Sequence, residues 1–172
     1  MAGEPLWPLL TFEGLEGDDL IDAYRQTYQQ TYVKKSNGDI PVFQDWTGAY
    51  VEFRAWQFDH AFSKTDGYRQ GLDHDSFSLE RAERMLWIQE VLQASKGTIN
   101  RYIQTHTTNR GDKKRRRTFF VHEERYLVVL DEPYREGGGF QFITAYPVYD
   151  HDYLQRIKQN SVLVECRKGG KK

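Results

Sequence analysis

The sequence predicts an α+β protein, because helical patterns come first and strand patterns follow. Apolar residues recur at helical spacing in two segments of the first half, whereas short β-forming runs separated by turn residues dominate from residue 115 onward. With 172 residues, 38% of them hydrophobic and 15% aromatic, the chain can build one core but not two. We therefore expect a single domain over residues 1–172.

The first half predicts a lead-in and two helices. Residues 1–16 contain proline and glycine breakers and should be irregular. Two aspartates then precede an amphipathic helix of about three turns, whose apolar positions are Leu20, Ile21, Tyr24, Tyr28 and Tyr32. Residues 49–53 predict a short strand, and residues 56–62 fit either a helix or a strand. A second helix follows Ser78, which can cap it, and its stripe is Leu79, Ala82, Met85, Leu86 and Leu92.

The second half predicts mostly strands. Residues 93–113 are polar and should be irregular. The strands expected after them are 116–121, 125–130, 140–146 and 161–166. Glycines 137–139 predict the turn before the third of these strands, and residues 150–159 fit a short helix. The tail 167–172 should be mobile.

Several classes of protein are excluded by what the chain lacks. No apolar run approaches the roughly 20 residues of a membrane span, and the N-terminal residues lack the regions of a signal peptide. A single cysteine, Cys166, leaves no internal disulfide. Metal patterns such as HExxH and CxxC are missing, as are phosphate-binding glycine motifs. We therefore expect a cytoplasmic protein without metal or cofactor, whose chemistry uses His, Arg, Lys, Tyr and Thr.

Charge is segregated along the chain although the net charge is only −1. Residues 1–95 hold 8 Lys and Arg against 16 Asp and Glu, whereas residues 96–126 hold 9 against 3. The centre of the basic part is Lys113, Lys114, Arg115, Arg116 and Arg117. This run is either the solvated end of a hairpin or a clamp for an RNA backbone.

His60 is the histidine with the most suggestive surroundings. It lies among aromatic residues, and its ordinary interpretation is a partly buried, hydrogen-bonded ring. On a helix it would share a face with Lys64, four residues later. A histidine so placed could act as a general base.

Arg81 and Arg84 are three residues apart on the second predicted helix, and so share a face. They are either solvated and paired with Glu80 or Glu83, or they form a guanidinium fork for a phosphate.

The strand 140–146 offers hydroxyl groups. A period of two places Phe142, Thr144 and Tyr146 on one face, with Ile143 and Ala145 on the face toward the helices. Tyr126, on the neighbouring strand, could add a third hydroxyl or a ring for base stacking. An ordinary sheet surface is the alternative.

Taken in order, these segments resemble a known family. The segments are His-Ala-Phe after a short strand, the helix Arg-Ala-Glu-Arg-Met-Leu-Trp-Ile, the strand Tyr-Leu-Val-Val-Leu, and Phe-Ile-Thr-Ala-Tyr-Pro after the glycine turn. Over residues 49–147 the chain resembles the phage-barnase–EndoU–colicin–RelE (BECR-type) nuclease toxins. The resemblance implies N-terminal helices packed on a four- to five-stranded antiparallel sheet.

The resemblance also implies a site. His60 would transfer protons, Arg84 or Arg81 would bind the phosphate, and Thr144 and Tyr146 would lie at the scissile phosphate. The resemblance implies a role for Tyr126 and Lys64 less strongly than for these residues. The pattern departs from the family in two ways: no glutamate base can be placed on the sheet, and a second catalytic histidine could be His122, His106 or neither.

The expected function is that of a toxin-like, metal-independent endoribonuclease. It would cleave RNA (tRNA, mRNA or rRNA) through attack by the 2′-hydroxyl, leaving 2′,3′-cyclic phosphate and 5′-hydroxyl ends. The family also suggests a neutralising antitoxin or immunity protein as partner. The alternatives are an RNA-binding module without catalysis and a phage-derived protein-interaction domain.

Overall fold

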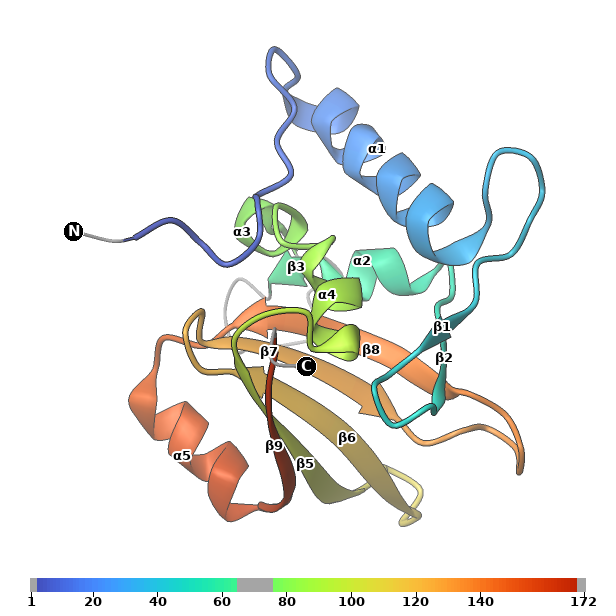
Figure 1. Cartoon of the computed structure of the whole chain (residues 1–172). Helices are drawn as coiled ribbons and strands as arrows, with labels where there is room; N and C mark the ends of the chain where they lie inside the picture. Colours follow the sequence, from blue (N-terminus) through green and yellow to red (C-terminus); the bar gives the residue numbers. More distant parts are fainter. Residues whose placement is uncertain (1–2, 65–75, 170–172) are drawn as a thin grey trace.

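The computed structural model describes residues 3–64 and 76–169, in which the helices of the first half lie on one side of a large sheet and a later helix lies on the other (Figure 1). The helices are α1 (Gly17–Tyr28), the π-helical turn η1 (Gln29–Val33), α2 (Gln57–Ala61), α3 (Leu79–Ala82), α4 (Trp87–Gln93) and α5 (His151–Gln159). The strands of the large sheet are β1 (Phe43–Gln44), β2 (Tyr50–Glu52), β5 (Thr98–Thr107), β6 (Lys113–Val121), β7 (Tyr126–Asp131), β8 (Phe140–Pro147) and β9 (Ser161–Lys168). Two short strands, β3 (Ser63–Lys64) and β4 (Ser76–Phe77), pair separately.

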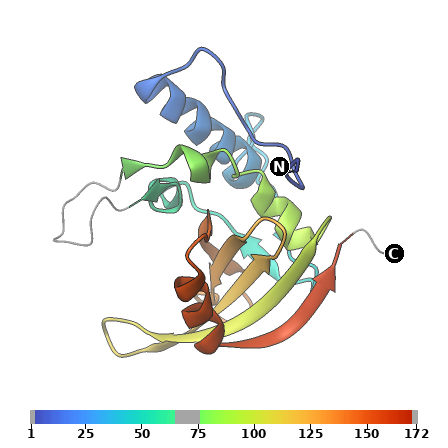
Figure 2. The same ribbon diagram turned by 90° about the vertical axis from the view of Figure 1, so that its left-hand side faces the viewer.

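The large sheet corrects the expected architecture. The chain is α+β, but the sheet has seven strands in the order β1-β2-β8-β7-β6-β5-β9, not four or five. It is also mixed, because β2 pairs parallel with β8 while the other neighbours are antiparallel. Figure 2 shows that its long strands curve strongly. Helices are not confined to the N-terminal half, since α5 follows β8.

Two further expectations about the second half are wrong. Residues 98–107, within the segment expected to be irregular, form β5, which lies between β6 and β9. Its polar side chains have partners, since Asn100 donates to the hydroxyl of Tyr102 and Arg101 pairs with Glu165. Arg167 and Lys168, expected in a mobile tail, belong to β9. Residues 170–172 lie outside the described part.

The predicted second helix is interrupted. Ser78 accepts a hydrogen bond from the main-chain N–H of Arg81 and so caps α3 as expected, but α3 ends at Ala82. Turns occupy residues 83–86, and the helical path resumes as α4. Arg81 and Arg84 therefore lie on different elements.

The larger core lies between the helices α1 to α4 and one face of the sheet. Tyr24, Tyr28 and Tyr32 recur every fourth residue on α1 and η1 and are fully buried. Burial raises the pKa of each of them, and their hydroxyls donate to carbonyls of segments distant in sequence: Leu10, Arg54 and Met85. These hydrogen bonds satisfy three buried hydroxyl groups. They also connect α1 and η1 to the lead-in, to the segment after β2 and to the turn between α3 and α4.

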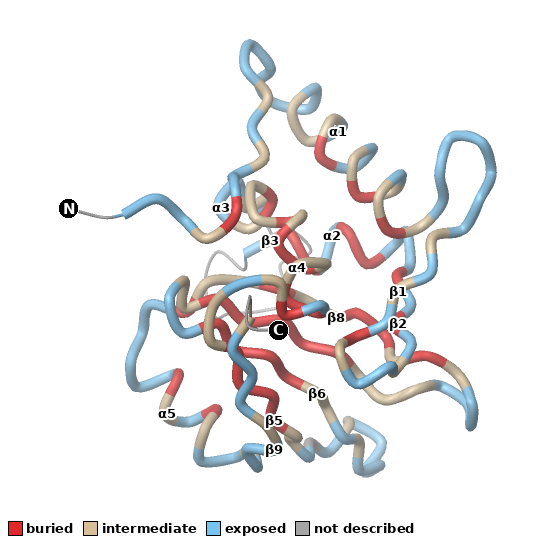
Figure 3. The backbone as a smooth tube through the Cα atoms, in the orientation of Figure 1, coloured by how far each residue is buried: buried red, intermediate tan, exposed pale blue. Residues whose placement is uncertain are grey.

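The opposite face, called here the open face, is only partly covered. Helix α5, capped by Asp150, packs Leu154 and Ile157 against Tyr102, Phe120, Leu127 and Val129. Because β7 has cover on both faces, its residues from Tyr126 to Leu130 are all buried. In Figure 3 the buried segments follow the central strands, whereas β9 is largely exposed.

An ion pair fixes the tip of the β1–β2 hairpin to the sheet. Asp45, whose side chain has no exposed surface, pairs with Arg117 of β6 and accepts hydrogen bonds from the main chain of Thr47 and Ala49. The guanidinium of Arg117 also stacks on Phe140. Arg117 is thus a structural residue.

We predict that Asp45→Ala lowers the free energy of unfolding by about 3 kcal/mol, because it leaves the Arg117 guanidinium without its carboxylate and the turn without its acceptor. The control is Asp59→Ala, which removes the exposed pair with Arg25 and should cost less than about 1 kcal/mol. Denaturant unfolding of both variants checks this. Equal losses would contradict the structural role of Asp45.

Candidate functional site

A β-bulge determines which side chains of β8 reach the open face. Val129 pairs with Thr144 and Leu130 with Phe142, so that Ile143 is an extra residue on β8. Phe142 and Ala145 enter the larger core, while Ile143 and Tyr146 pack toward the α5 side. Thr144 and Tyr146 share a face as expected, but the period of two misplaces Phe142 and Ile143.

Register places the open-face residues in three rows. The Tyr146 row is Phe120, Leu127 and Tyr146; the Thr144 row is Thr118, Val129 and Thr144; the Gln141 row is Arg116, Asp131, Gln141 and Glu52. Helix α5 covers the Phe120 end of the first row. The Gln141 row is polar throughout: Arg116 pairs with Asp131, and Gln141 donates to Glu52.

Three segments meet at the end of β8 beside the Tyr146 and Thr144 rows, and we call this place the Tyr146 corner. The guanidinium of Arg81 lies 4.7 Å from the centre of the Tyr146 ring and donates to the carbonyl of Ser63. The hydroxyl of Thr144 donates to the carbonyl of Ala61, at 3.4 Å. The end of α2 and the start of α3 are therefore held against the same part of β8.

His60 is exposed on α2, one residue before the carbonyl that Thr144 contacts. Along α2, Gln57 donates to the carbonyl of Ile143 and Phe58 enters the larger core. At about 100° per residue, His60 projects roughly 200° from Phe58 and 60° from Gln57. Because Phe58 points into the larger core, His60 points away from that core and is exposed to solvent.

Tyr153 of α5 completes the Tyr146 corner. Its hydroxyl lies 2.7 Å from that of Tyr146. Burial raises the pKa of Tyr146, the hydrogen bond with Tyr153 raises it further, and the charges of Arg81 and Arg116 act in the opposite direction. The Tyr146 phenol is consequently a neutral hydrogen-bonding group at neutral pH.

Tyr153 was absent from the residues expected from the sequence. A signal was available, because Asp150 is a good N-cap and Tyr153 then precedes Ile157 by one helical turn. What could not be read from the sequence is that α5 returns to the sheet beside Tyr146.

Arg84 does not join Arg81 at the corner. Its guanidinium stacks on Trp87 and donates to the carbonyl of Glu80. The helix that would have aligned the two arginines ends between them, and their guanidinium groups contact different rings, Arg81 that of Tyr146 and Arg84 that of Trp87.

Two weaker candidates also lie elsewhere. Tyr126 is fully buried on the opposite face, where its ring meets Trp87 edge to face and its hydroxyl donates to the carbonyl of Arg84. It cannot stack on a base. Lys64 is exposed on β3, after the end of α2, so it does not share a helical face with His60.

The basic run alternates between the two faces of β6. Lys114 and Arg116 share the open face, where Lys114 lies near the Tyr134 ring and Arg116 pairs with Asp131. Arg117 faces the other way, toward Asp45, while Lys113 and Arg115 are exposed. The run is therefore not one continuous clamp.

His122, one of the two candidates for a second catalytic ring, does not lie at the Tyr146 corner. His122 contacts Phe120 edge to face, two strands away from Tyr146. His74 lies outside the described residues, as do its neighbours in 65–75. Within the described residues no group of three or more His, Cys, Asp or Glu is placed to hold a metal ion.

Compared with known proteins, the chain matches no family model, no curated protein and no solved structure. The resemblance to the nuclease toxins thus stays a prediction. Among the described helices, none has the length and apolar character needed to cross a membrane.

We predict that Tyr146 does not ionise in the folded protein near pH 10, where a free phenol is half ionised. Because its pKa is raised on folding, its contribution to stability is present below about pH 10 and is lost as the pH rises further. Ultraviolet titration of wild type and Tyr146→Phe should give the same tyrosinate signal at about pH 10. The two should differ by one tyrosine only in denaturant; a difference in the folded state would contradict the raised pKa.

Proposed function

We propose that the protein is a metal-independent endoribonuclease whose reaction centre is the Tyr146 corner. The observation that carries the proposal is the meeting of Arg81 with Tyr146, next to the contact between Thr144 and the α2 residue that follows His60. An imidazole, a guanidinium and a neutral phenol are the groups that phosphodiester transesterification uses.

The residues divide the reaction among them. His60 takes the proton of the 2′-hydroxyl as its oxygen forms a bond to phosphorus, and the bond from phosphorus to the 5′-oxygen breaks. The Tyr146–Tyr153 pair donates a proton to that leaving oxygen, and solvent restores it. Arg81 stabilises the negative charge that grows on the phosphoryl oxygens. Thr144 holds the end of α2 in position through Ala61.

RNA in the cytoplasm is the proposed substrate, and the open face offers a path for it. Lys114 and Arg116 extend from the corner along β6, and Arg54 lies at the far end of the Gln141 row. These cations suit a phosphate backbone, although Arg116 and Arg54 also serve ion pairs. A neutralising partner protein belongs to the same proposal, since an unrestrained ribonuclease would damage its host.

The test is incubation with total RNA in EDTA, followed by analysis of the ends. We expect 2′,3′-cyclic phosphate and 5′-hydroxyl products, and no cleavage of DNA, which lacks the nucleophile. Salt-sensitive RNA binding without any product would instead favour the non-catalytic RNA-binding module. Absence of both binding and cleavage would favour the protein-interaction domain.

We predict that His60→Ala lowers the cleavage rate by about 10²–10⁴-fold, the usual effect of losing a proton-transfer group. His60 is exposed, so the melting temperature should change little. Single-turnover rates on a short oligoribonucleotide measure the effect. Full activity in this variant would remove His60 from the mechanism.

A paired substitution separates the two arginines. Arg81→Ala should lower the rate by about 10²–10³-fold through loss of charge stabilisation, whereas Arg84→Ala should leave it within a few-fold, because Arg84 contacts Trp87 away from the corner. Thermal unfolding of both variants serves as the control for folding. Equal losses of activity, or a larger loss in Arg84→Ala, would contradict the proposed centre.

A further inference from the structure

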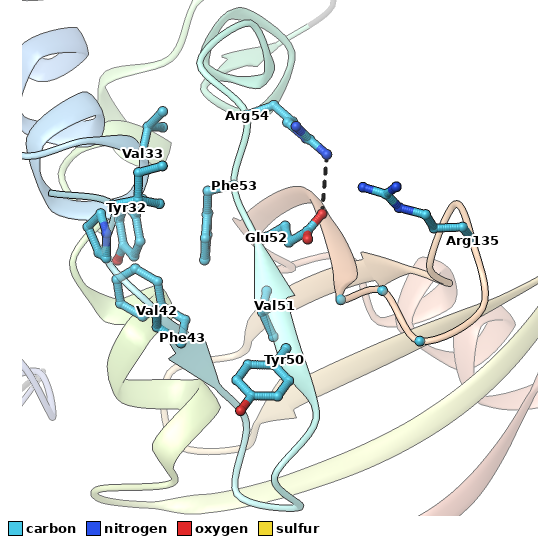
Figure 4. A pocket seen from close by; sticks show the side chains of 15 residues that line it. Tyr32, Val33, Val42, Phe43, Tyr50, Val51, Glu52, Phe53, Arg54 and Arg135 are labelled. Atoms are coloured by element: carbon cyan, nitrogen blue, oxygen red, sulfur yellow. Dashed lines mark hydrogen bonds and ion pairs between the residues drawn. The ribbon is translucent and has the colours of Figure 1, made fainter. Parts of the chain in front are cut away.

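A second hollow lies at the edge of β2, away from the Tyr146 corner. Its volume is about 510 Å³, within the range of about 300–1,000 Å³ typical of small-molecule sites. The β1–β2 ladder ends at the pair Phe43–Val51, so beyond this point β2 is paired with β8 but not with β1. Figure 4 shows β2 between two unlike walls. One wall carries Tyr32, Val42, Phe43 and Phe53; the other carries Glu52, Arg54 and Arg135.

The mouth of this hollow is lined by exposed apolar and aromatic side chains. Ile40 and Val42 are 73% and 75% exposed, and Tyr50 is 56% exposed. All three line the same hollow. A group of exposed apolar and aromatic side chains around a concave site is typical of a surface that receives a ligand.

The polar wall offers one guanidinium for an anion. Arg54 is already engaged, because it donates to Glu52 and Gln141. The side chain of Arg135 has no hydrogen bond or ion pair with any residue in the described part of the chain. It lies beside glycines 137–139, and a Cβ atom at Gly139 would come within 3.1 Å of the Tyr50 carbonyl. This close fit holds the turn, and with it Arg135, against β2.

The hollow is continuous with the open face. A smaller hollow of about 220 Å³ shares Glu52, Arg54 and Arg135 with it and reaches Gln141. From Gln141, β8 leads to Tyr146 over five residues, a distance of roughly 16 Å at about 3.3 Å per residue. An RNA strand cleaved at the Tyr146 corner would therefore place another of its nucleotides, not the scissile one, in the hollow.

We propose that this hollow binds one base–phosphate unit of a nucleotide. The base stacks on Tyr50, the exposed aromatic side chain at the mouth, and the phosphate pairs with Arg135. The unit comes from a free nucleotide or from a flanking nucleotide of an RNA strand, and both sources have the same chemistry. The second source rests on the proposed ribonuclease function, whereas the first does not.

The experiment is an NMR titration of the full chain with two kinds of probe. The first is the set of AMP, CMP, GMP and UMP, with ribose 5-phosphate to test the need for the base. The second is a 2′-O-methyl tetranucleotide, which binds like RNA but cannot be cleaved. We expect shifts at Tyr50 and Arg135. Shifts with mononucleotides indicate a free-nucleotide site; shifts with the tetranucleotide alone indicate a flanking subsite.

Variants test the contacts. Arg135→Ala and Tyr50→Ala should each weaken binding about tenfold, whereas Arg110→Ala, an exposed arginine at the β5–β6 turn, should leave it unchanged. No shifts at the hollow with any probe, or equal affinity of wild type and Arg135→Ala, would overturn the proposal. Cleavage of RNA is assayed separately, so a failed subsite with intact cleavage, or nucleotide binding without cleavage, shows which proposal is wrong.

Discussion

The extra residue in β8 is the constraint on which the arrangement of the Tyr146 corner depends. Strict alternation would send Phe142 to the same face as Tyr146 and leave a gap in the aromatic core. With Ile143 bulged, Phe142 packs against Tyr28 and Phe53 while Thr144 and Tyr146 stay on the open face. The ladder position beyond β2 is then taken by α2, whose Gln57 donates to the Ile143 carbonyl. The bulge and α2 thus form one unit, in which the Thr144 hydroxyl contacts the end of α2.

The alternation of side chains along the strands determines which charged and aromatic residues are buried. A run of five basic residues is one patch in sequence, but a strand turns alternate side chains to opposite faces. Arg117 becomes the partner of the buried Asp45, and Arg116 the partner of Asp131. The same alternation buries Tyr126 against Trp87. The basic run therefore contributes ion pairs that stabilise the fold, in addition to the anion-binding surface proposed for it.

The sequence predicts the local features well and the long-range ones poorly. Ser78 caps a helix, tyrosines at helical spacing bury one face of α1, and the glycines 137–139 precede a strand, because each is decided by neighbouring residues. The strands β1 and β2 have only two and three residues, so they are defined by their pairing and not by a local pattern. The partner of β2 is β8, which lies almost ninety positions later in the sequence. The bulge at Ile143 and the meeting of Tyr146 with Tyr153 carry no local signal. The sequence therefore predicts Arg81 and Tyr146, which the structure places in contact, but not the neighbouring Tyr153.

The electrostatics of the corner assign different roles to its groups. Moving a phenol out of water disfavours its anion, and the neighbouring phenol of Tyr153 adds to this effect on the pKa of Tyr146. Two guanidinium groups, of Arg81 and Arg116, oppose the shift without reversing it. A phenol that stays protonated beside a permanent cation can donate to an oxygen that gains charge, but it cannot accept the first proton. In the proposed mechanism that task belongs to His60, which is exposed on α2.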